Sequence, residues 1–227
     1  MSTRKVLGKN AEKLSDKNVV IIGVGGLGCT VANLLARLEI NLTLIDYDVV
    51  SASNLERQIL YDENDLSKKK VKVAKEKLEQ FTNIKIIDEG IEADNIKKLI
   101  PKNVDLIIDC TDNVKTRITI NRYCIKKNIN WIYSGAVCNI GAIYFIDNKN
   151  NGPCYECLQQ DKDGQTSCEI GVLNSLVVMV ASMTANIAVT YLANDKIEDN
   201  LLRINLTTNN IMKIAVKKKS DCVCSKK

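Results

Sequence analysis

Short apolar runs alternate with segments of helical periodicity over the first 150 residues of the chain. The runs expected to form strands are residues 18–22, 41–46, 84–90, 105–110 and 130–135. Helices are expected from about Leu27, from about Lys68, from about Asp94 and over residues 114–127. Repeated βα units of this kind close into a parallel sheet with helices on both faces. The pattern therefore predicts an α/β fold with a mostly parallel sheet flanked by helices.

The pattern changes near residue 150. A further strand is expected at 142–147, and two strand-like runs, LLRINL and IMKIAV, are separated by TTNN, which is typical of a hairpin turn. Antiparallel strands should therefore extend the sheet near the C-terminus. We see no repeat or linker-like stretch in the sequence, so we expect one compact unit over residues 1–227, with a change of character between 1–150 and 151–227.

One uncharged stretch raises the question of a membrane. Residues 170–194 carry no charge and are long enough to span a bilayer as a helix. However, Ser175, Ser182, Asn186 and Thr190 recur at helical spacing and place polar groups along one stripe. We therefore expect a helix that packs on protein, and no membrane partner.

Composition narrows the chemistry. The 227 residues are 45% hydrophobic and 26% charged, and the net charge of +5 comes from scattered lysines, so charge alone does not indicate nucleic-acid binding. The chain has no histidine, which removes the commonest general base and metal ligand, so a metal would have to bind sulfur or carboxylate. Nine cysteines without an N-terminal apolar leader indicate a cytoplasmic protein with reduced thiols, and clustered thiols suggest metal binding or catalysis.

The segment GVGGLG, residues 23–28, follows an apolar strand and opens a helix. In that context backbone N–H groups and a helix N-terminus can bind phosphate oxygens. Asp46 ends the next strand, where a carboxylate can hold ribose hydroxyls. Together they predict a Rossmann-like nucleotide site; the alternative is that the glycines serve only a tight turn between strand and helix.

The residues after Asp46 suggest a triphosphate rather than a dinucleotide. Ser53, Asn54, Arg57 and Gln58 share one loop, and Lys70 opens the following helix. Arginine and lysine can bind phosphate oxygens and stabilise charge during phosphoryl attack. The loop could instead leave Arg57 and Lys70 solvated or ion-paired with nearby acids, which are Asp62, Glu63 and Asp65.

Asp112 follows the strand at 105–110, at the edge of the sheet where ligands bind in open α/β folds. A carboxylate there can hold Mg²⁺. Asp112 could instead cap the helix that begins near Val114, and Asp48 could simply bond its own turn.

The cysteines form two clusters. Cys154 and Cys157 make a CxxC and Cys222 and Cys224 a CxC, giving four thiolates of the kind that bind Zn²⁺ tetrahedrally. Unmetallated thiols or a redox disulfide are the alternatives. Four further cysteines fall in or beside apolar segments and are expected to be small core residues: Cys29, Cys110, Cys124 and Cys138.

Six motifs, in order GVGGLG, DYDVVSASNLERQ, DLSKKKV, DCTDN, GPCYECL and SCEIGVL, resemble the MoeB/ThiF/HesA family of ubiquitin-activating-enzyme-like adenylyltransferases. The resemblance covers nearly the whole chain. It implies a single ThiF-type adenylylating domain, with a nucleotide-binding part at 1–150. The implied activity is adenylylation of the C-terminal carboxylate of a ubiquitin-like sulfur carrier with MgATP, releasing pyrophosphate.

The same resemblance implies residue roles. Gly26 would approach the phosphates, Asp46 would hold the ribose, and the triphosphate would meet Ser53, Asn54, Arg57 and Lys70. Asp112 would bind magnesium, with Asn113 beside it. Catalytic roles fall to Arg57, Lys70, Asp112 and Cys168; the last matches a loop cysteine that in some members links covalently to the activated carrier, although a loop cysteine can also be inert.

The implied partners are a carrier ending in Gly-Gly, a separate sulfur donor and a second copy of the chain in a homodimer. The chain departs from the family in its second cysteine pair, because relatives carry CxxC at both places. Two other functions stay open: a non-catalytic nucleotide-binding zinc scaffold, and an NAD-dependent dehydrogenase, against which the lack of a catalytic acid or base argues.

Overall fold

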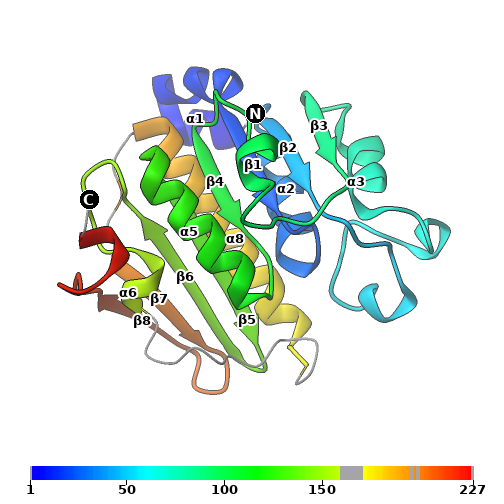
Figure 1. Cartoon of the computed structure of the whole chain (residues 1–227). Helices are drawn as coiled ribbons and strands as arrows, with labels where there is room; N and C mark the ends of the chain where they lie inside the picture. Colours follow the sequence, from blue (N-terminus) through cyan, green and yellow to red (C-terminus); the bar gives the residue numbers. More distant parts are fainter. Residues whose placement is uncertain (1, 159–170, 195–196, 198–199, 226–227) are drawn as a thin grey trace.

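The computed structural model describes residues 2–158, 171–194, 197 and 200–225. Its strands form one sheet of eight in the order β3-β2-β1-β4-β5-β6-β7-β8 (Figure 1). The bounds are β1 Asn18–Ile22, β2 Asn41–Ile45, β3 Ile84–Ile87, β4 Leu106–Asp109, β5 Trp131–Val137, β6 Ile140–Ile146, β7 Asn200–Asn205 and β8 Asn210–Ala215. The strands from β3 to β5 pair in parallel, and β5 to β8 pair antiparallel. The predicted fold class is confirmed.

The parallel strands are apolar on both faces because both faces are covered. All four residues of β4 are buried, as are the last four residues of β1 and of β2. One face is covered by α2 (Gly26–Ala36), α3 (Lys70–Leu78) and α8 (Asn174–Asn194), together with the N-terminal segments α1 (Ser2–Leu7) and a 3-10 stretch, Gly8–Asp16. The other face is covered by α4 (Ile96–Leu99), α5 (Val114–Lys127) and α6 (Tyr155–Leu158). In Figure 1, α5 and α8 accordingly lie on opposite sides of the sheet.

The change of character near residue 150 does not interrupt the sheet. β6 precedes it and β7 follows it, and the two strands pair directly, with Gly141 opposite Ile204. The predicted hairpin is β7–β8, whose register places Asn205 opposite Asn210.

Helix α8 is long and apolar enough to cross a membrane by length and composition alone. In this fold 61% of its apolar window is buried inside the protein. The helix packs on α2, β5 and β6, while Ser182 and Asn186 point to solvent. Helix α8 therefore packs against the sheet as part of the core, as the stripe of polar residues along it predicted.

The helix expected from about Asp94 is present as α4, and it is short because Pro101 disfavours helical backbone at Ile100, which is extended. One local expectation was wrong. Cys138 is exposed in the turn between β5 and β6 at a positive φ of 53°, whereas Cys29, Cys110 and Cys124 are buried as expected.

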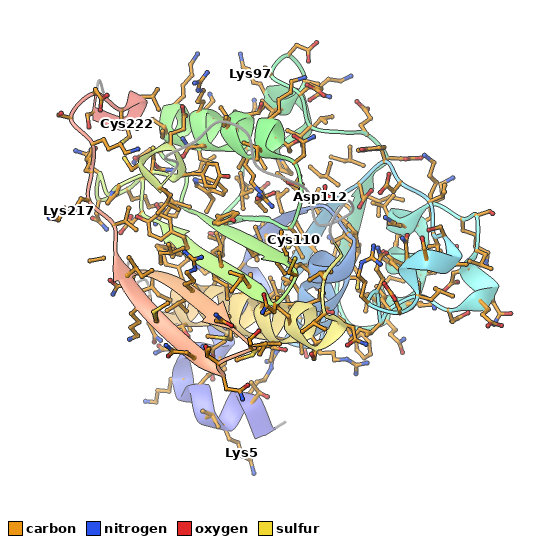
Figure 2. The ribbon with its side chains drawn as sticks, turned by 90° about the horizontal axis from the view of Figure 1, so that it is seen from below. Lys5, Lys97, Cys110, Asp112, Lys217 and Cys222 are labelled. Carbon is orange, nitrogen blue, oxygen red and sulfur yellow. The ribbon has the colours of Figure 1, made fainter. Side chains whose placement is uncertain are left out.

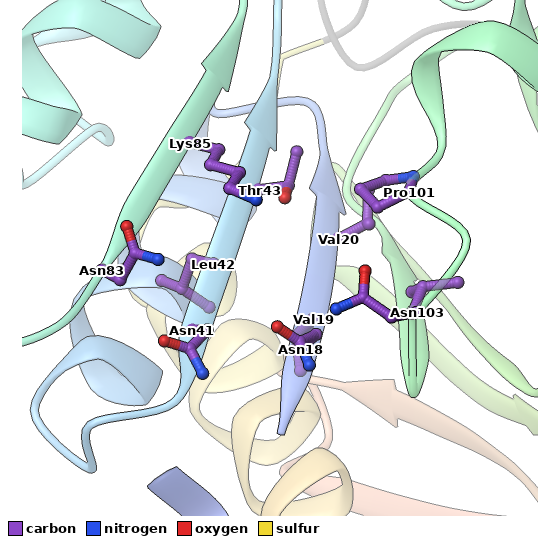
Figure 3. A pocket seen from close by; sticks show the side chains of 11 residues that line it. Asn18, Val19, Val20, Asn41, Leu42, Thr43, Asn83, Lys85, Pro101 and Asn103 are labelled. Carbon is purple, nitrogen blue, oxygen red and sulfur yellow. The ribbon is translucent and has the colours of Figure 1, made fainter. Parts of the chain in front are cut away.

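A small hollow lies at the amino ends of β1 and β2, lined by polar side chains that include Asn18, Asn41 and Asn103 (Figure 3). Its volume of about 30 Å³ has room for a single water molecule. Because ligands of open α/β sheets bind at the opposite, carboxyl ends of the strands, this hollow is a packing feature.

Candidate nucleotide-binding site and four-cysteine cluster

The largest described pocket opens at the carboxyl ends of β1, β2 and β4, with a volume of about 560 Å³. Strand order reverses between β1 and β4, and this is the position where open α/β sheets bind their ligands. The volume falls within the range of pockets for small organic ligands. Of the predicted cofactor-binding residues, the pocket wall includes Gly26, Asp46, Asn54, Arg57, Lys70, Asp112 and Asn113.

The glycine loop turns directly from β1 into α2, whose first residue is Gly26. A Cβ on Gly28 would lie 1.8 Å from the Gly23 carbonyl oxygen, so only glycine allows this turn. A Cβ on Gly26 would lie 2.9 Å from Val177 Cγ1, and Gly26 faces the pocket. The loop therefore needs glycine both for its turn and for open space at the N-terminus of a helix, where anions bind.

Asp46 is tied to this loop. Its Oδ2 accepts a hydrogen bond from the Val24 N–H at 2.6 Å, and its Oδ1 accepts one from the Asp48 N–H at 2.8 Å. Burial raises the pKa of Asp46, and these two backbone donors oppose the shift. Each oxygen has a second lone pair, so the fixed carboxylate can still accept hydroxyl donors from a ligand.

Lys70 is almost fully buried at the start of α3 and forms an ion pair with Asp48, with Nζ 2.9 Å from Oδ2. The acids offered as alternative partners, Asp62 and Asp65, pair with Lys77 instead. Asp48 thus does more than bond its own turn: it fixes the ammonium group at the pocket wall, where a lysine can meet phosphate oxygens.

Arg57 lies next to the glycine loop. Its Nη1 donates to the Ser53 carbonyl at 2.8 Å and to Glu56 Oε1 at 2.9 Å, and 21% of its side chain is exposed. Asn54 accepts from the Ser51 N–H in a capping box of the 3-10 helix Ala52–Asn54. The Ser53 hydroxyl instead lies 3.1 Å from that of Ser51, and it is Ser51 that lines the pocket.

In the turn after β4, the structure shows which residue caps α5, a role that the sequence left open for Asp112. Asn113 caps α5, since its Oδ1 accepts from the Thr116 N–H at 3.1 Å. Asp112 is therefore not the cap, and it lines the pocket beside Cys110 (Figure 2). Asp112 therefore lines the same pocket as Lys70 and Arg57.

Behind this turn lies a buried ion pair. Asp109 is fully buried, and its Oδ2 is 3.4 Å from Nε of Arg117. Thr111 donates to Oδ1 through both its N–H and its hydroxyl. Burial raises the pKa of Asp109 to about 6, while Arg117 opposes the shift, so the carboxylate is ionised at neutral pH.

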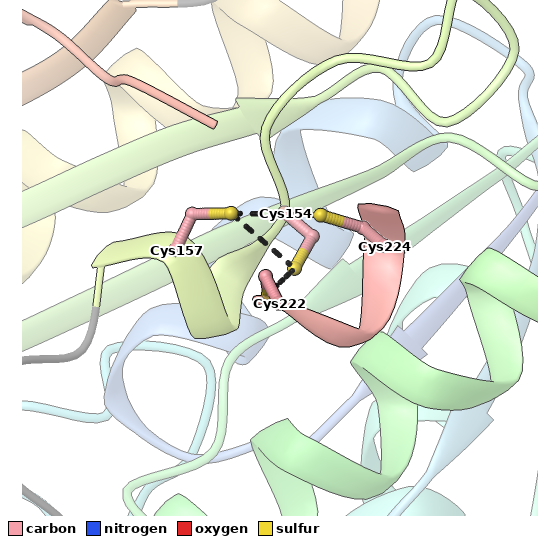
Figure 4. A group of neighbouring side chains, drawn as sticks. All are labelled: Cys154, Cys157, Cys222 and Cys224. Atoms are coloured by element: carbon pink, nitrogen blue, oxygen red, sulfur yellow. Dashed lines mark hydrogen bonds between the residues drawn. The ribbon is translucent and has the colours of Figure 1, made fainter. Parts of the chain in front are cut away.

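The four predicted metal ligands meet in one buried cluster (Figure 4), which we call the four-cysteine cluster: Cys154, Cys157, Cys222 and Cys224. All four Sγ atoms lie within 4.8 Å of one another, and three of the sulfur–sulfur distances are 3.5, 3.5 and 4.0 Å. Tetrahedral zinc with bonds of about 2.3 Å separates its sulfurs by about 3.8 Å, so the donors fit such an ion. The shorter CxC spacing does not prevent this arrangement.

These cysteines are thiols and not disulfides. Burial raises the pKa of Cys154, so in this environment a cation is needed to hold it as a thiolate. Cys168, the predicted catalytic cysteine, lies outside the described residues.

The sequence analysis gave no role to three residues at the site. Asp48 was set aside as a turn residue, although the D-x-D spacing after a strand placed both acids at one edge. Gln58 lines the pocket, is 4% exposed, and its Oε1 has no hydrogen-bond partner. Arg117, which borders a small neighbouring cavity with Gly26 and Arg57, had no sequence signal beyond its place on the predicted helix.

The fold and the site define an α/β protein with a pocket suited to a nucleotide and a separate four-cysteine cluster. The family model described as the ThiF family matches residues 2–225, and the chain therefore belongs to the ThiF family. The resemblance inferred from the motifs is confirmed.

Individual relatives agree with the family. The chain is 34% identical to the molybdopterin-synthase adenylyltransferase of Escherichia coli K12 over 188 residues, which is 80% of this chain and 75% of that one. It is 31% identical to the sulfur carrier protein ThiS adenylyltransferase of the same organism, over 85% of this chain and 79% of that one. Among solved structures, E. coli MccB with ATP matches with a TM-score of 0.84 at 23% identity, covering 98% of this chain and 70% of that one.

Proposed function

We propose that the protein is an ATP-dependent adenylyltransferase that activates the C-terminal carboxylate of a ubiquitin-like sulfur carrier. The observation that carries this proposal is the meeting of Lys70, Arg57 and Asp112 around one pocket beside the glycine loop. Two cations and a carboxylate suit a metal-bound triphosphate better than a nicotinamide dinucleotide. The names of the two adenylyltransferase relatives support the same reaction.

In this reaction the carrier carboxylate attacks the α-phosphorus of ATP. The new bond joins carboxylate oxygen to phosphorus, the bond to the bridging oxygen breaks, and pyrophosphate leaves with the electron pair. The nucleophile is already ionised at neutral pH, so the step needs orientation and charge stabilisation more than proton transfer. A chain without histidine is therefore equipped for it.

Each pocket residue then has a task. The N–H groups at Gly26 and the start of α2 face the phosphates, and Asp46 receives the ribose hydroxyls. Lys70, oriented by Asp48, and Arg57 bind the oxygens of the triphosphate and the leaving pyrophosphate. Asn54 lines the same pocket.

The pocket also offers oxygen donors for magnesium. Asp112, like Asp48 and Glu92 of the pocket lining, is a carboxylate of the type that Mg²⁺ binds together with phosphate. We assign Asp112 to hold the ion, which supplies neutralisation of phosphate charge when bound. For the four-cysteine cluster we propose Zn²⁺ in a structural role, since four sulfur ligands leave no open coordination position.

We further propose that the carrier ends in Gly-Gly, that a separate protein donates sulfur, and that the enzyme acts as a homodimer in the cytoplasm. A narrow tail suits the small cavity of about 60 Å³ next to the pocket, which Gly26, Arg57 and Arg117 border. Whether Cys168 bonds covalently to the activated carrier is a separate proposal, on a segment outside the described residues.

The test is ATP–pyrophosphate exchange with magnesium against a panel of ubiquitin-like carriers. We expect exchange that depends on one carrier and is lost in Arg57→Ala. Arg37→Ala is the matched control, because Arg37, directly after α2, is exposed, stacks beside Phe81 and does not line the pocket. ATP binding without exchange for any carrier would instead favour a non-catalytic scaffold, and preferential NAD binding would favour a dehydrogenase.

A further inference from the structure

Arg117 is a buried, charged side chain to which the proposed reaction assigns no role. It lies in the first turns of α5, only 12% of its side chain is exposed, and its Nε has no hydrogen-bond partner. The facing Asp109 Oδ2 also has none, and the two atoms are 3.4 Å apart. Burying a guanidinium costs free energy of desolvation, so its place in the interior calls for an explanation.

On one side, Arg117 holds the turn that carries Asp112. Its Nη2 donates to the Thr111 carbonyl at 2.5 Å, directly before Asp112. The Thr111 N–H and hydroxyl are in turn bound by Asp109, the other member of the ion pair. The ion pair therefore binds both backbone polar groups of Thr111: Asp109 accepts from its N–H, and Arg117 donates to its carbonyl.

Arg117 also contacts two aromatic rings, Tyr133 and Tyr155, and Tyr155 belongs to the segment that carries two cysteines of the four-cysteine cluster. The guanidinium lies 5.0 Å from the centroid of the Tyr133 ring, and the Tyr133 and Tyr155 centroids are 5.0 Å apart. Tyr155 also interacts with the guanidinium through its hydroxyl. Tyr155 lies between Cys154 and Cys157 on α6, so whatever fixes those cysteines also fixes this ring.

A second link ties the cluster to the same helix. Asn121 on α5 accepts from the Tyr155 N–H at 3.1 Å and donates to Cys154 Sγ at 3.5 Å. Figure 2 shows Cys222 of the cluster well away from Asp112, with α5 running between them. The cluster and the pocket are thus joined by one continuous chain of contacts.

We propose that Arg117 is a positioning residue that couples metal binding at the four-cysteine cluster to magnesium binding at Asp112. With metal bound, α6 holds Tyr155 against Arg117, and Arg117 holds the Thr111 carbonyl, so that Asp112 is presented to the pocket. Without metal, Tyr155 is released and the turn loses one of its supports. This inference rests on the proposed nucleotide site, and it adds that the distant metal sets the magnesium requirement of that site.

The experiment measures ATP binding by the full-length protein over a range of magnesium concentrations. We expect Arg117→Lys and Tyr155→Phe to raise the half-saturating magnesium concentration by about tenfold, the usual effect of losing a partner that orients a metal ligand. ATP binding without magnesium should not change. Tyr155→Phe keeps the ring, which guards against a variant that merely fails to fold.

Two variants on α5 serve as matched controls. Arg122→Lys alters an arginine that also contacts α6, through Glu156, but is 61% exposed and binds Glu156 and not Thr111. Tyr123→Phe removes a hydroxyl from a partly buried tyrosine of the same helix. Both should retain the magnesium requirement of the wild type.

The metal arm strips zinc with a chelator, which is then removed before magnesium is added back. Trp131 is the single tryptophan of the chain, is fully buried, and its ring centroid is 6.0 Å from that of Tyr155, so its fluorescence should change when Tyr155 is released. Stripping should raise the magnesium requirement of the wild type by about tenfold, and should add little further in Arg117→Lys, because the coupled path is already broken.

The possible results separate this inference from the proposed function. Unchanged magnesium requirements in folded Arg117→Lys and Tyr155→Phe, or an equal effect of stripping in the wild type and Arg117→Lys, would overturn the coupling alone. Shifted requirements without pyrophosphate exchange for any carrier would support the coupling and overturn the adenylyltransferase assignment. A wild type that binds no ATP would overturn both.

Discussion

The ammonium of Lys70 lies 2.9 Å from Oδ2 of Asp48, at the wall of the nucleotide pocket. The two members are unequally exposed, at 6% for the lysine side chain and 49% for the carboxylate. A buried ammonium needs a partner, and the half-exposed carboxylate supplies it while leaving the remaining N–H donors for other acceptors. The pair therefore holds the Lys70 ammonium at the pocket wall.

Asp48→Asn should weaken this arrangement while keeping the size of the side chain. We expect a loss of about 1–3 kcal/mol in unfolding free energy, the usual scale for a hydrogen bond to a charged group. The ATP concentration for half-maximal exchange should also rise, because Lys70 loses its orientation. Denaturant unfolding and pyrophosphate exchange measure the two effects.

The neighbouring pair provides the control. Lys69 and Asp88 are also 2.9 Å apart, but both side chains are about one third exposed, at 37% and 34%. Asp88→Asn should therefore cost less than about 1 kcal/mol and leave exchange unchanged. Equal effects of the two substitutions would show that Asp48 acts only as a surface charge.

Asp112→Asn keeps the shape of the side chain and removes its charge. Since Asn113 provides the cap of α5, the helix should remain intact, as circular dichroism would show. Magnesium-dependent exchange should fall by about two orders of magnitude, the scale of losing one electrostatic contact to charge in the transition state. Wild-type exchange in a folded variant would remove Asp112 from the mechanism.

Gly26→Ala tests whether this glycine serves packing or phosphate access. Its new Cβ would lie 2.9 Å from Val177 Cγ1, a methyl group on a stiff β-branched side chain, so stability should fall by about 1–3 kcal/mol. Nucleotide affinity should fall as well, because the methyl group also faces the pocket.

The double variant Gly26→Ala with Val177→Ala separates the two effects. Removing the valine methyl groups relieves the contact, so the added cost of Gly26→Ala should be smaller in a Val177→Ala background. Affinity for ATP should stay low in calorimetry. If affinity returned together with stability, Gly26 would act through packing alone.

Much of the fold was predictable because its signals are local. Strand β1, the glycine loop and helix α2 follow one another in sequence, and Asp46 ends the next strand, so a reader of the sequence could place them at one edge of the sheet. The two cysteine pairs were also visible as metal ligands. Their meeting across the chain depends on the sheet continuing from β6 into β7, which the two strand-like runs LLRINL and IMKIAV indicated.

The missed features depend on how distant elements dock. Asp48 and Lys70 are separated by 22 positions, and only the packing of α3 brings their charges together. Asp112 and Asn113 are both good capping residues, so the sequence alone could not decide which one caps α5. Arg117 points inward because α5 packs its first turns against the end of β4, an orientation that helical periodicity does not specify.

The four-cysteine cluster predicts a specific metal dependence. Wild-type protein should contain about one zinc ion per chain, and Cys224→Ser should lose it, because a serine hydroxyl replaces one of four thiolates. Unfolding temperature should fall, and the segment around residues 220–225 should become sensitive to proteolysis, since the metal ties it to α6.

Cys138→Ser is the matched control for this experiment. Cys138 is exposed, and the four ligands lie elsewhere. Zinc content and unfolding temperature should match the wild type. Retained zinc in Cys224→Ser would show that the CxC pair does not complete the site.

Asp109 should make stability depend on pH between about 4 and 6. Burial raises its pKa from 3.8 to about 6, so in this window the folded protein binds more protons at Asp109 than the unfolded chain does. Its contribution is fully present below pH 3.8 and is lost as pH rises through 6, with a total on the order of 3 kcal/mol.

Asp109→Asn lacks this titration but also leaves Arg117 without its counter-ion, so its absolute stability is not informative. The informative quantity is the difference in unfolding free energy between wild type and Asp109→Asn, measured by denaturant titration across pH. We expect that difference to fall from pH 4 to 6 and to become constant above 7, whereas a difference independent of pH would mean that Arg117 holds the pKa of Asp109 near its ordinary value.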